Sequence, residues 1–170
     1  VDDSTLTLCK KFYNEGQYTK AVDLYKESSF EKLSAEELFY LGLSYNNLRA
    51  IIKASQYFKK AVELKPDLYG YRLQLARVLN QLGQTANAIS NYETIIQSDT
   101  NNAAALFELG LIQFDKREYT TSIKLFSKLV EINSNDFLSS YYLGYSKLLS
   151  TNPNIAEEGT ADLKHAVALN

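Results

Sequence analysis

The stretch "ELFYLGLSYNNL" at residues 37–48 decides the fold, because similar stretches recur along the chain at a fixed spacing. They are "ALFELGLIQFDK" at 105–116, "LSSYYLGYSKLL" at 138–149 and, in a weaker form, "GYRLQLARVLNQ" at 70–81. Aligned on Gly42, Ala76, Gly110 and Gly144, the stretches lie 34 residues apart at every step. One step further back, a spacing of 33 residues leads to Cys9. A fixed period of this length indicates a repeat architecture.

Each of these stretches is followed by a second one with the same kind of apolar spacing. Apolar residues recur three and four positions apart, as in Leu38, Leu41 and Tyr45, which is the spacing of one helix face. Turn residues lie between the stretches, such as "NEGQ" at 14–17 and "NSND" at 133–136. We therefore expect an all-α chain of about five antiparallel helix-turn-helix repeats, over residues 2–34, 35–68, 69–102, 103–136 and 137–170.

The second of these repeats resembles the tetratricopeptide repeat family, whose helix-turn-helix unit has a period of 34 residues. The resemblance is carried by Leu38, Leu41, Gly42, Tyr45, Ala54, Phe58, Ala61 and Pro66, with Leu38 where the family prefers Trp. It extends over essentially the whole chain and implies a right-handed superhelical solenoid, a single domain of residues 1–170. Because the chain does not begin with Met, we expect a processed chain or a fragment of a longer protein.

Small residues recur where the two helices of each repeat are expected to cross. Close approach of two helices requires small side chains on both of them. These residues are Cys9, Gly42, Ala76, Gly110 and Gly144 on first helices, and Ala21, Ala54, Ala88, Ser122 and Gly159 on second helices.

The last repeat departs from the others in two ways. It contains three additional residues at 152–154, "NPN", which we expect to form a protruding loop. The apolar residues of its final stretch have no following repeat to cover them, and so predict self-association through this end of the chain. They are Leu163, Ala166, Val167 and Leu169.

Composition and charge exclude several classes of function. Eighteen Lys and Arg against 20 Asp and Glu give a net charge of −2, which favours neither nucleic acid nor an anionic membrane surface as a partner. No apolar run approaches the roughly 18 residues that cross a bilayer, so no membrane insertion is predicted. We expect a soluble protein and leave its compartment open between the cytoplasm and the periplasm.

Motifs for catalysis and for metal or cofactor binding are absent from the sequence. There is no glycine-rich phosphate loop and no nucleophile motif with a plausible base partner. Cys9 and His165 are the only cysteine and histidine, and no ligand cluster accompanies them. We expect a buried structural thiol at Cys9 and a surface position for His165. The chain is therefore predicted not to be an enzyme, and to bind no cofactor or metal.

First helices of such a stack line a concave groove, which is the predicted binding surface for a peptide or partner helix. By family resemblance the groove residues are Phe39, Leu43, Asn46, Asn47, Leu73, Arg77, Asn80, Gln81, Phe107, Leu111, Phe114, Tyr141 and Tyr145. The apolar members would contact apolar side chains, and the amides would hydrogen-bond a peptide backbone. Aromatic residues at this spacing equally serve packing between repeats, and both interpretations stay open.

The leading functional prediction is a protein-protein interaction scaffold with a protein or peptide as its partner. One alternative is a structural scaffold that self-associates through the C-terminal helix. Another is a non-catalytic region of a larger enzyme or assembly factor.

Overall fold

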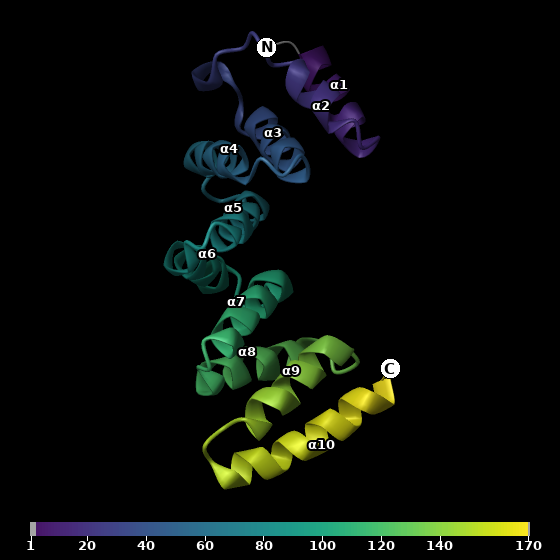
Figure 1. Cartoon of the computed structure of the whole chain (residues 1–170), viewed down its shortest axis with the longest axis vertical. Helices are drawn as coiled ribbons and strands as arrows, with labels where there is room; N and C mark the ends of the chain where they lie inside the picture. Colours follow the sequence, from purple (N-terminus) through teal and green to yellow (C-terminus); the bar gives the residue numbers. More distant parts are fainter. Residues whose placement is uncertain (1–2, 170) are drawn as a thin grey trace. The chain divides into compact units, whose positions relative to one another are not determined.

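The computed structural model describes residues 3–169, which form ten α-helices, one 3-10 helix and no strand (Figure 1). Two successive helices fall within each predicted repeat, so the all-α helix-turn-helix repeat fold is confirmed. The helices are α1 (Asp3–Asn14), α2 (Tyr18–Asp23), η1 (Phe30–Lys32, the 3-10 helix), α3 (Ala35–Asn47), α4 (Ile51–Leu64), α5 (Tyr69–Gln81), α6 (Thr85–Ser98), α7 (Ala103–Asp115), α8 (Tyr119–Ile132), α9 (Phe137–Leu148) and α10 (Pro153–Leu169).

The chain divides into two compact units, residues 1–91 (unit 1) and 92–170 (unit 2), and the division lies inside α6. Unit 1 holds α1 to α5, and unit 2 holds α7 to α10. None of the helices among residues 3–169 is both long and apolar enough to span a membrane.

Side-chain caps fix where three of the first helices begin. At the start of α3, Ser34 and Glu37 form a capping box, in which the Ser34 N–H donates to the Glu37 carboxylate over 2.8 Å. At the start of α7, the Asn102 side chain accepts from a backbone N–H over 3.1 Å. At the start of α9, the Asp136 carboxylate accepts from the N–H of Ser139 over 3.0 Å. These caps recur at matching repeat positions and satisfy N–H groups that the helix itself leaves unpaired.

In repeats two and four, the glycine of the first helix faces a phenylalanine ring of the second. A Cβ atom on Gly42 would lie 2.7 Å from the Phe58 ring, and one on Gly110 would lie 2.8 Å from Phe126 Cζ. Both rings are fully buried. The missing side chain therefore provides the space that the ring occupies.

In the last repeat, the crossing brings two helix backbones into contact. A Cβ atom on Gly144 of α9 would lie 2.8 Å from the backbone nitrogen of Leu163 in α10. One on Gly159 of α10 would lie 2.6 Å from the carbonyl oxygen of Gly144. The predicted pairing of small residues at a helix crossing is thus most direct here.

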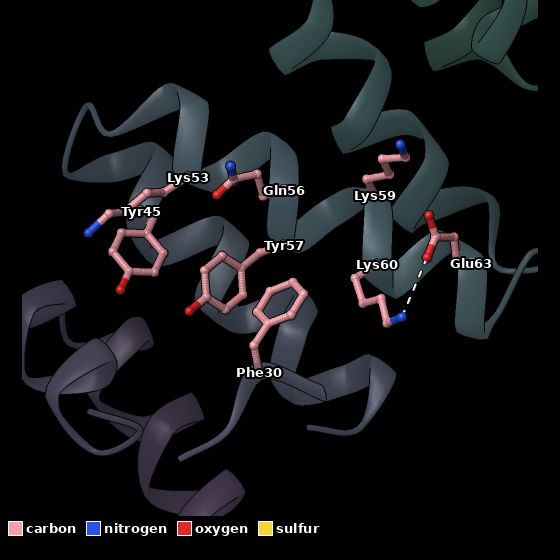
Figure 2. A pocket seen from close by; sticks show the side chains of 8 residues that line it. All are labelled: Phe30, Tyr45, Lys53, Gln56, Tyr57, Lys59, Lys60 and Glu63. Carbon is pink, nitrogen blue, oxygen red and sulfur yellow. Dashed lines mark ion pairs between the residues drawn. The ribbon is translucent and has the colours of Figure 1, made fainter. Parts of the chain in front are cut away.

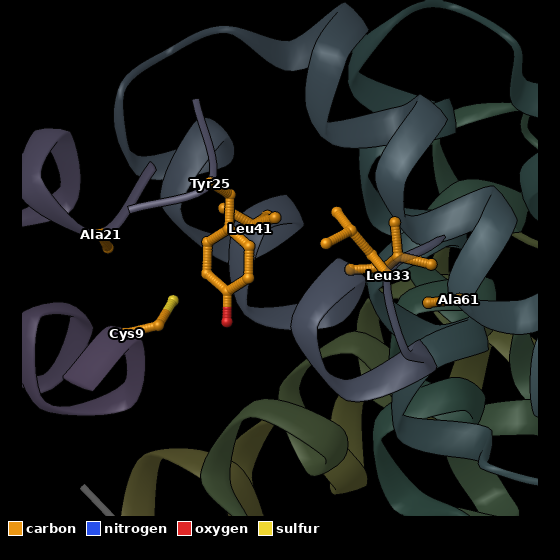
Figure 3. Packing of buried hydrophobic residues seen from close by; sticks show 7 residues of the cluster. Cys9, Ala21, Tyr25, Leu33, Leu41 and Ala61 are labelled. Carbon is orange, nitrogen blue, oxygen red and sulfur yellow. The ribbon is translucent and has the colours of Figure 1, made fainter. Parts of the chain in front are cut away.

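Cys9 lies in the core that joins the first two repeats, together with Ala21, Tyr25, Leu33, Leu38, Leu41 and Ala61 (Figure 3). Its side chain is fully buried. Burial, helped by the charge of Glu37, raises the pKa of the thiol to about 11. The expectation of a buried thiol is confirmed, and the thiol is protonated at neutral pH.

The second helix of the first repeat is shorter than the repeat period predicts. α2 ends at Asp23 after six residues, and the chain continues through turns to η1. This early end places Phe30 of η1 against Tyr57 of α4, with ring centroids 4.9 Å apart.

The expectation of a protruding loop at residues 152–154 is wrong. The additional residues lengthen α10, which has 17 residues where α8 has 14. Pro153 is the first residue of α10, a position where the N–H that proline lacks would have no helical partner. The side chain of Asn152 accepts from the N–H of Asn154 over 3.1 Å, which caps the extended helix.

The expectation of an uncovered apolar end on α10 is only partly met. Ala166 is fully buried, which corrects the sequence-based expectation, and Leu163 and Leu169 are half-buried. Val167 remains 73% exposed. Ala166 is covered because α10 packs along α9 within the repeat itself.

Candidate functional site

Phe39, a predicted groove residue of unit 1, packs between neighbouring helices. Its ring stacks on Tyr71 of α5 with centroids 4.3 Å apart and lies 5.8 Å from the buried ring of Phe58. The side chain is half-buried between two core clusters. Phe39 therefore stabilises the junction of α3, α4 and α5.

Four further predicted residues of unit 1 are half-buried: Leu43 and Asn46 on α3, and Leu73 and Arg77 on α5. Leu43 packs against the cluster around Phe58. Leu73 and Arg77 are four residues apart and so lie on one face of α5. Each of these side chains retains some surface that a partner can reach.

The exposed amides of unit 1 lie at the C-terminal ends of α3 and α5. The Asn47 side chain donates to the carbonyl oxygen of Leu43 over 2.9 Å, and the Thr85 hydroxyl donates to the side-chain oxygen of Asn80 over 3.2 Å. Gln81 is exposed beside Asn80. These contacts hold Asn47 and Asn80 close to their helix ends while one polar atom of each amide points away from the contact.

In unit 2, Phe107 and Leu111 of α7 are half-buried in the core around Phe126. The Phe107 ring lies 5.7 Å from Phe126 and 6.0 Å from Tyr142, edge-on to both. Their surroundings match those of Phe39 in unit 1, and they serve mainly to pack α7 against α8 and α9.

Four aromatic rings of unit 2 stack in a row from the start of α9 to the end of α7. Tyr141 and Tyr145 stack with centroids 5.8 Å apart, and each remains 37% exposed. Phe137 stacks on Tyr141 at 6.0 Å, and Phe114 of α7 stacks on Tyr145 at 5.7 Å. We call Phe114, Phe137, Tyr141 and Tyr145 the aromatic face of unit 2.

Exposed leucines extend the aromatic face along α9. Leu138 and Leu148 are both exposed, and with Tyr141 and Tyr145 they are spaced by three or four residues. This spacing places all four on one side of the helix. Contiguous exposed apolar surface of this kind is typical of a binding site.

Within residues 3–169 no group of three or more His, Cys, Asp and Glu side chains is arranged to hold a metal ion. His165 is exposed, as expected, and its Nε2 lies 3.4 Å from the carbonyl oxygen of Ser134. What the aromatic face offers is contact with apolar groups and hydrogen bonds from its phenols.

A separate pocket of about 440 Å³ on unit 1 was not anticipated from the sequence (Figure 2). Its aromatic residues are Phe30, Tyr45 and Tyr57, with Tyr57 4.9 Å from Phe30 and 5.1 Å from Tyr45 between ring centroids. The other lining residues are Lys53, Gln56, Lys59, Lys60 and Glu63. The repeat pattern could have drawn attention to Tyr45 and Tyr57, but Phe30 comes from η1, which departs from the repeat.

The chain was compared with known protein families and structures. Residues 38–68 and 73–137, together more than half of the chain, match the tetratricopeptide repeat. A crystal structure of MamA protein superposes with a TM-score of 0.85 and 20% identity, covering 99% of this chain and 93% of that one. A MamA structure from Desulfovibrio magneticus RS-1 superposes with a TM-score of 0.83 and 19% identity, covering 97% of this chain and 92% of that one. At sequence identities of 19% and 20%, the structural similarity shows that this chain and MamA share a fold.

Curated relatives share the repeat over part of their length. Tetratricopeptide repeat protein 21B of Xenopus laevis is 24% identical over 107 residues, which is 63% of this chain and 8% of that protein. BBSome complex member BBS4 of Bos taurus is 24% identical over 144 residues, 84% of this chain and 28% of the relative. Protein O-mannosyl-transferase TMTC1 of Homo sapiens is 25% identical over 131 residues, which is 77% of this chain and 15% of that protein.

The chain thus spans less than a third of the length of each of these relatives. Two family matches, the recurring helix pairs and the small residues at their crossings agree with one another. The chain therefore belongs to the tetratricopeptide repeat family.

Proposed function

We propose that the chain is a protein-interaction scaffold whose aromatic face in unit 2 binds an apolar segment of a partner protein. The observation that carries this proposal is that Tyr141 and Tyr145 are each 37% exposed while their rings are stacked. Membership of a family of scaffolds supports it. So does BBS4, a relative that is named as a member of a complex.

The stacked rings are suited to binding because their positions are set before a partner arrives. Phe114, Tyr141 and Tyr145 hold one another, so ordering them on binding costs little conformational entropy. Truncation of an aromatic anchor typically costs about 1–2 kcal/mol or more of binding free energy. Because the contact is mainly apolar, its affinity should depend little on salt.

In unit 1 we propose a separate contact with a partner backbone, made by the polar residues at the ends of α3 and α5. Asn47, Asn80 and Gln81 are exposed, and an amide can donate to and accept from an extended peptide backbone. Leu73 and Arg77 lie further back along the same helix as Asn80. Phe39 is assigned to packing instead.

Self-association through α10 is the weaker candidate. Among the apolar residues near its end, Val167 is exposed, whereas Ala166 is fully buried. The aromatic face offers more apolar surface in one place. A partner segment on unit 2 is therefore favoured over a second copy of the chain.

The test is selection of random phage-displayed peptides, each long enough to span one repeat, on the immobilised chain. We expect enrichment of peptides with two or more aromatic or large aliphatic residues, and at least about tenfold weaker binding to the Tyr141→Ala, Tyr145→Ala double variant. Ile52→Ala, which removes an exposed apolar side chain from α4, is the matched control and should bind as the wild type does. Unchanged affinity in the double variant would place the binding surface elsewhere.

A further inference from the structure

We propose that the pocket between η1, α3 and α4 is a second binding site, for an acidic peptide segment that inserts one aromatic side chain between flanking carboxylates. The site lies wholly within unit 1 and differs in chemistry from the aromatic face of unit 2. Its aromatic residues would receive the ring, and its lysines would pair with the carboxylates.

The aromatic part of the pocket is a row of three rings. Phe30 meets Tyr57 edge-on, at an interplanar angle of 79°, and Tyr57 is tilted by 35° against Tyr45 (Figure 2). All three side chains are half-buried, so each presents part of its ring to the hollow. A hollow of about 440 Å³ lies within the usual range for small-ligand sites, and it accommodates an aromatic side chain.

The Tyr57 phenol remains protonated at neutral pH. Burial, together with a hydrogen bond with Tyr45, raises the pKa of Tyr57 to about 12. Tyr57 therefore adds a hydroxyl group and no negative charge to the pocket. An approaching carboxylate meets the lysines without competition from a phenolate at Tyr57.

The lysines around the pocket differ in how they are paired. Lys60 Nζ lies 3.4 Å from Glu31 and 3.7 Å from Glu63, so its charge is partly compensated. Lys53 Nζ lies 5.3 Å from the centroid of the Tyr45 ring. Across residues 3–169, no carboxylate lies within ion-pair distance of Lys53 or Lys59.

These charges give the pocket a net positive lining on a chain whose net charge is negative. Two cations without acidic partners beside an apolar hollow are complementary to a ring with adjacent carboxylates. Charge complementarity thus specifies the occupant.

The last repeat supports this assignment, because the chain itself places carboxylates against lysine at the equivalent place. Lys147, three residues after Gly144, corresponds to Tyr45, three residues after Gly42. Lys147 Nζ lies 2.8 Å from Asp162 and 3.3 Å from Glu158. Glu158 and Asp162 in turn occupy the repeat positions of Lys53 and Tyr57.

The two repeats therefore differ in whether this position is filled. In the last repeat, an ion-pair network within the chain occupies it. In the second repeat the equivalent residues are two tyrosines and a lysine, and the hollow stays open.

The experiment is an NMR titration of the ¹⁵N-labelled full chain with a synthetic peptide in which one phenylalanine is flanked by glutamates on both sides. We expect shift changes at the pocket residues and saturable binding that weakens as salt is raised. Lys53→Glu combined with Lys59→Glu should weaken it at least about tenfold, since two attractions become repulsions. Both side chains are exposed, so the variant should keep the native spectrum.

Matched controls separate the contributions of the peptide's aromatic ring, of its negative charges and of the position of the lysines on the protein. The peptide with alanine in place of phenylalanine and the peptide with glutamine in place of glutamate should each bind more weakly. Lys124→Glu, an exposed lysine of α8, should leave the affinity unchanged.

Three outcomes would overturn the proposal. They are equal binding of the glutamine peptide, unchanged affinity in the double variant, and shift changes confined to unit 2. Self-association of the chain that disappears in the double variant would assign the pocket to a second copy, and would equally refute an acidic peptide as its occupant.

Discussion

Repeat two (residues 35–68) and the last repeat (137–170) share one period but differ at three equivalent places. At the helix crossing, Gly42 faces the Phe58 ring, whereas Gly144 faces the backbone of α10. On the first helix, Phe39 is packed against Tyr71, whereas Tyr141 is exposed.

Beside the crossing, repeat two has an open aromatic and lysine pocket, and the last repeat has an ion-pair network. The comparison indicates that the repeat period determines where the helices lie. The residue type at each position decides whether that position packs, pairs or remains open to a partner.

The largest expected effect is at the backbone contact of the last repeat. Gly159→Ala places a Cβ atom 2.6 Å from the carbonyl oxygen of Gly144, and no side-chain rotation relieves that clash. We expect a loss of about 3 kcal/mol or more of unfolding free energy for this repeat, at the upper end of overpacking costs. Hydrogen exchange of the α9 and α10 amides measures it, and unchanged protection would refute the close crossing.

Gly42→Ala should cost less, because the clashing atoms belong to a side chain. The Cβ would meet the Phe58 ring at 2.7 Å, and the ring can shift. Alanine also gains about 1 kcal/mol of helix propensity over glycine, so the net loss should be about 1 kcal/mol.

A double-mutant cycle with Phe58→Leu sharpens the comparison. The smaller side chain should relieve the clash, with a coupling free energy of about 1 kcal/mol or more by urea denaturation. Additive effects of the two substitutions would show that Phe58 does not occupy the space above Gly42.

Phe39→Ala and Tyr141→Ala probe one repeat position in two environments. Removing the half-buried Phe39 ring should cost about 2 kcal/mol of stability, since full burial of a phenylalanine is worth about 3–5 kcal/mol. Removing the exposed Tyr141 ring should cost less than about 1 kcal/mol, the value of a surface ring pair. Equal losses in thermal unfolding would contradict the assignment of packing to one and exposure to the other.

The smallest expected effect concerns the ion-pair network of the last repeat. Burial lowers the pKa of Lys147, but hydrogen bonds and charges of Asp162 and Glu158 outweigh it and raise the pKa above its ordinary value. This stabilisation is present below the unfolded-state pKa of lysine and is lost as pH rises through the raised folded-state pKa.

Lys147→Met should therefore cost about 0.5 kcal/mol at neutral pH and low salt, and less in high salt. Denaturation curves of wild type and variant should converge above the raised pKa of Lys147. A difference that persisted at high pH and high salt would point to packing of the lysine stem instead of charge.

Periodicity was sufficient to predict the helix pairs and the small residues at their crossings, because both depend on residue type at a fixed spacing. It failed where the chain departs from the period. α2 ends early, at Asp23, and Phe30 of η1 then lines a pocket that no repeat position predicts. At residues 152–154, Asn152 caps α10 and Pro153 begins it, because proline suits the first position of a helix.

The candidate site was predicted in outline, as a list of first-helix residues. Which of them pack and which are exposed depends on neighbours that the repeat pattern does not specify. Tyr71 of α5 covers Phe39, whereas within residues 3–169 the rings that contact Tyr141 all belong to its own helix, at Phe137, Tyr142 and Tyr145.

Affinity and stability measured together on Tyr141→Ala test the central claim most directly. The tightest selected peptide is titrated calorimetrically into wild type and variant, and the thermal unfolding of both is recorded. We expect binding weakened about tenfold with nearly unchanged unfolding temperature, because an exposed ring contributes more to a partner than to the core. Unchanged affinity, or a loss of affinity that merely follows a loss of folded protein, would contradict the claim that the aromatic face of unit 2 is the binding surface.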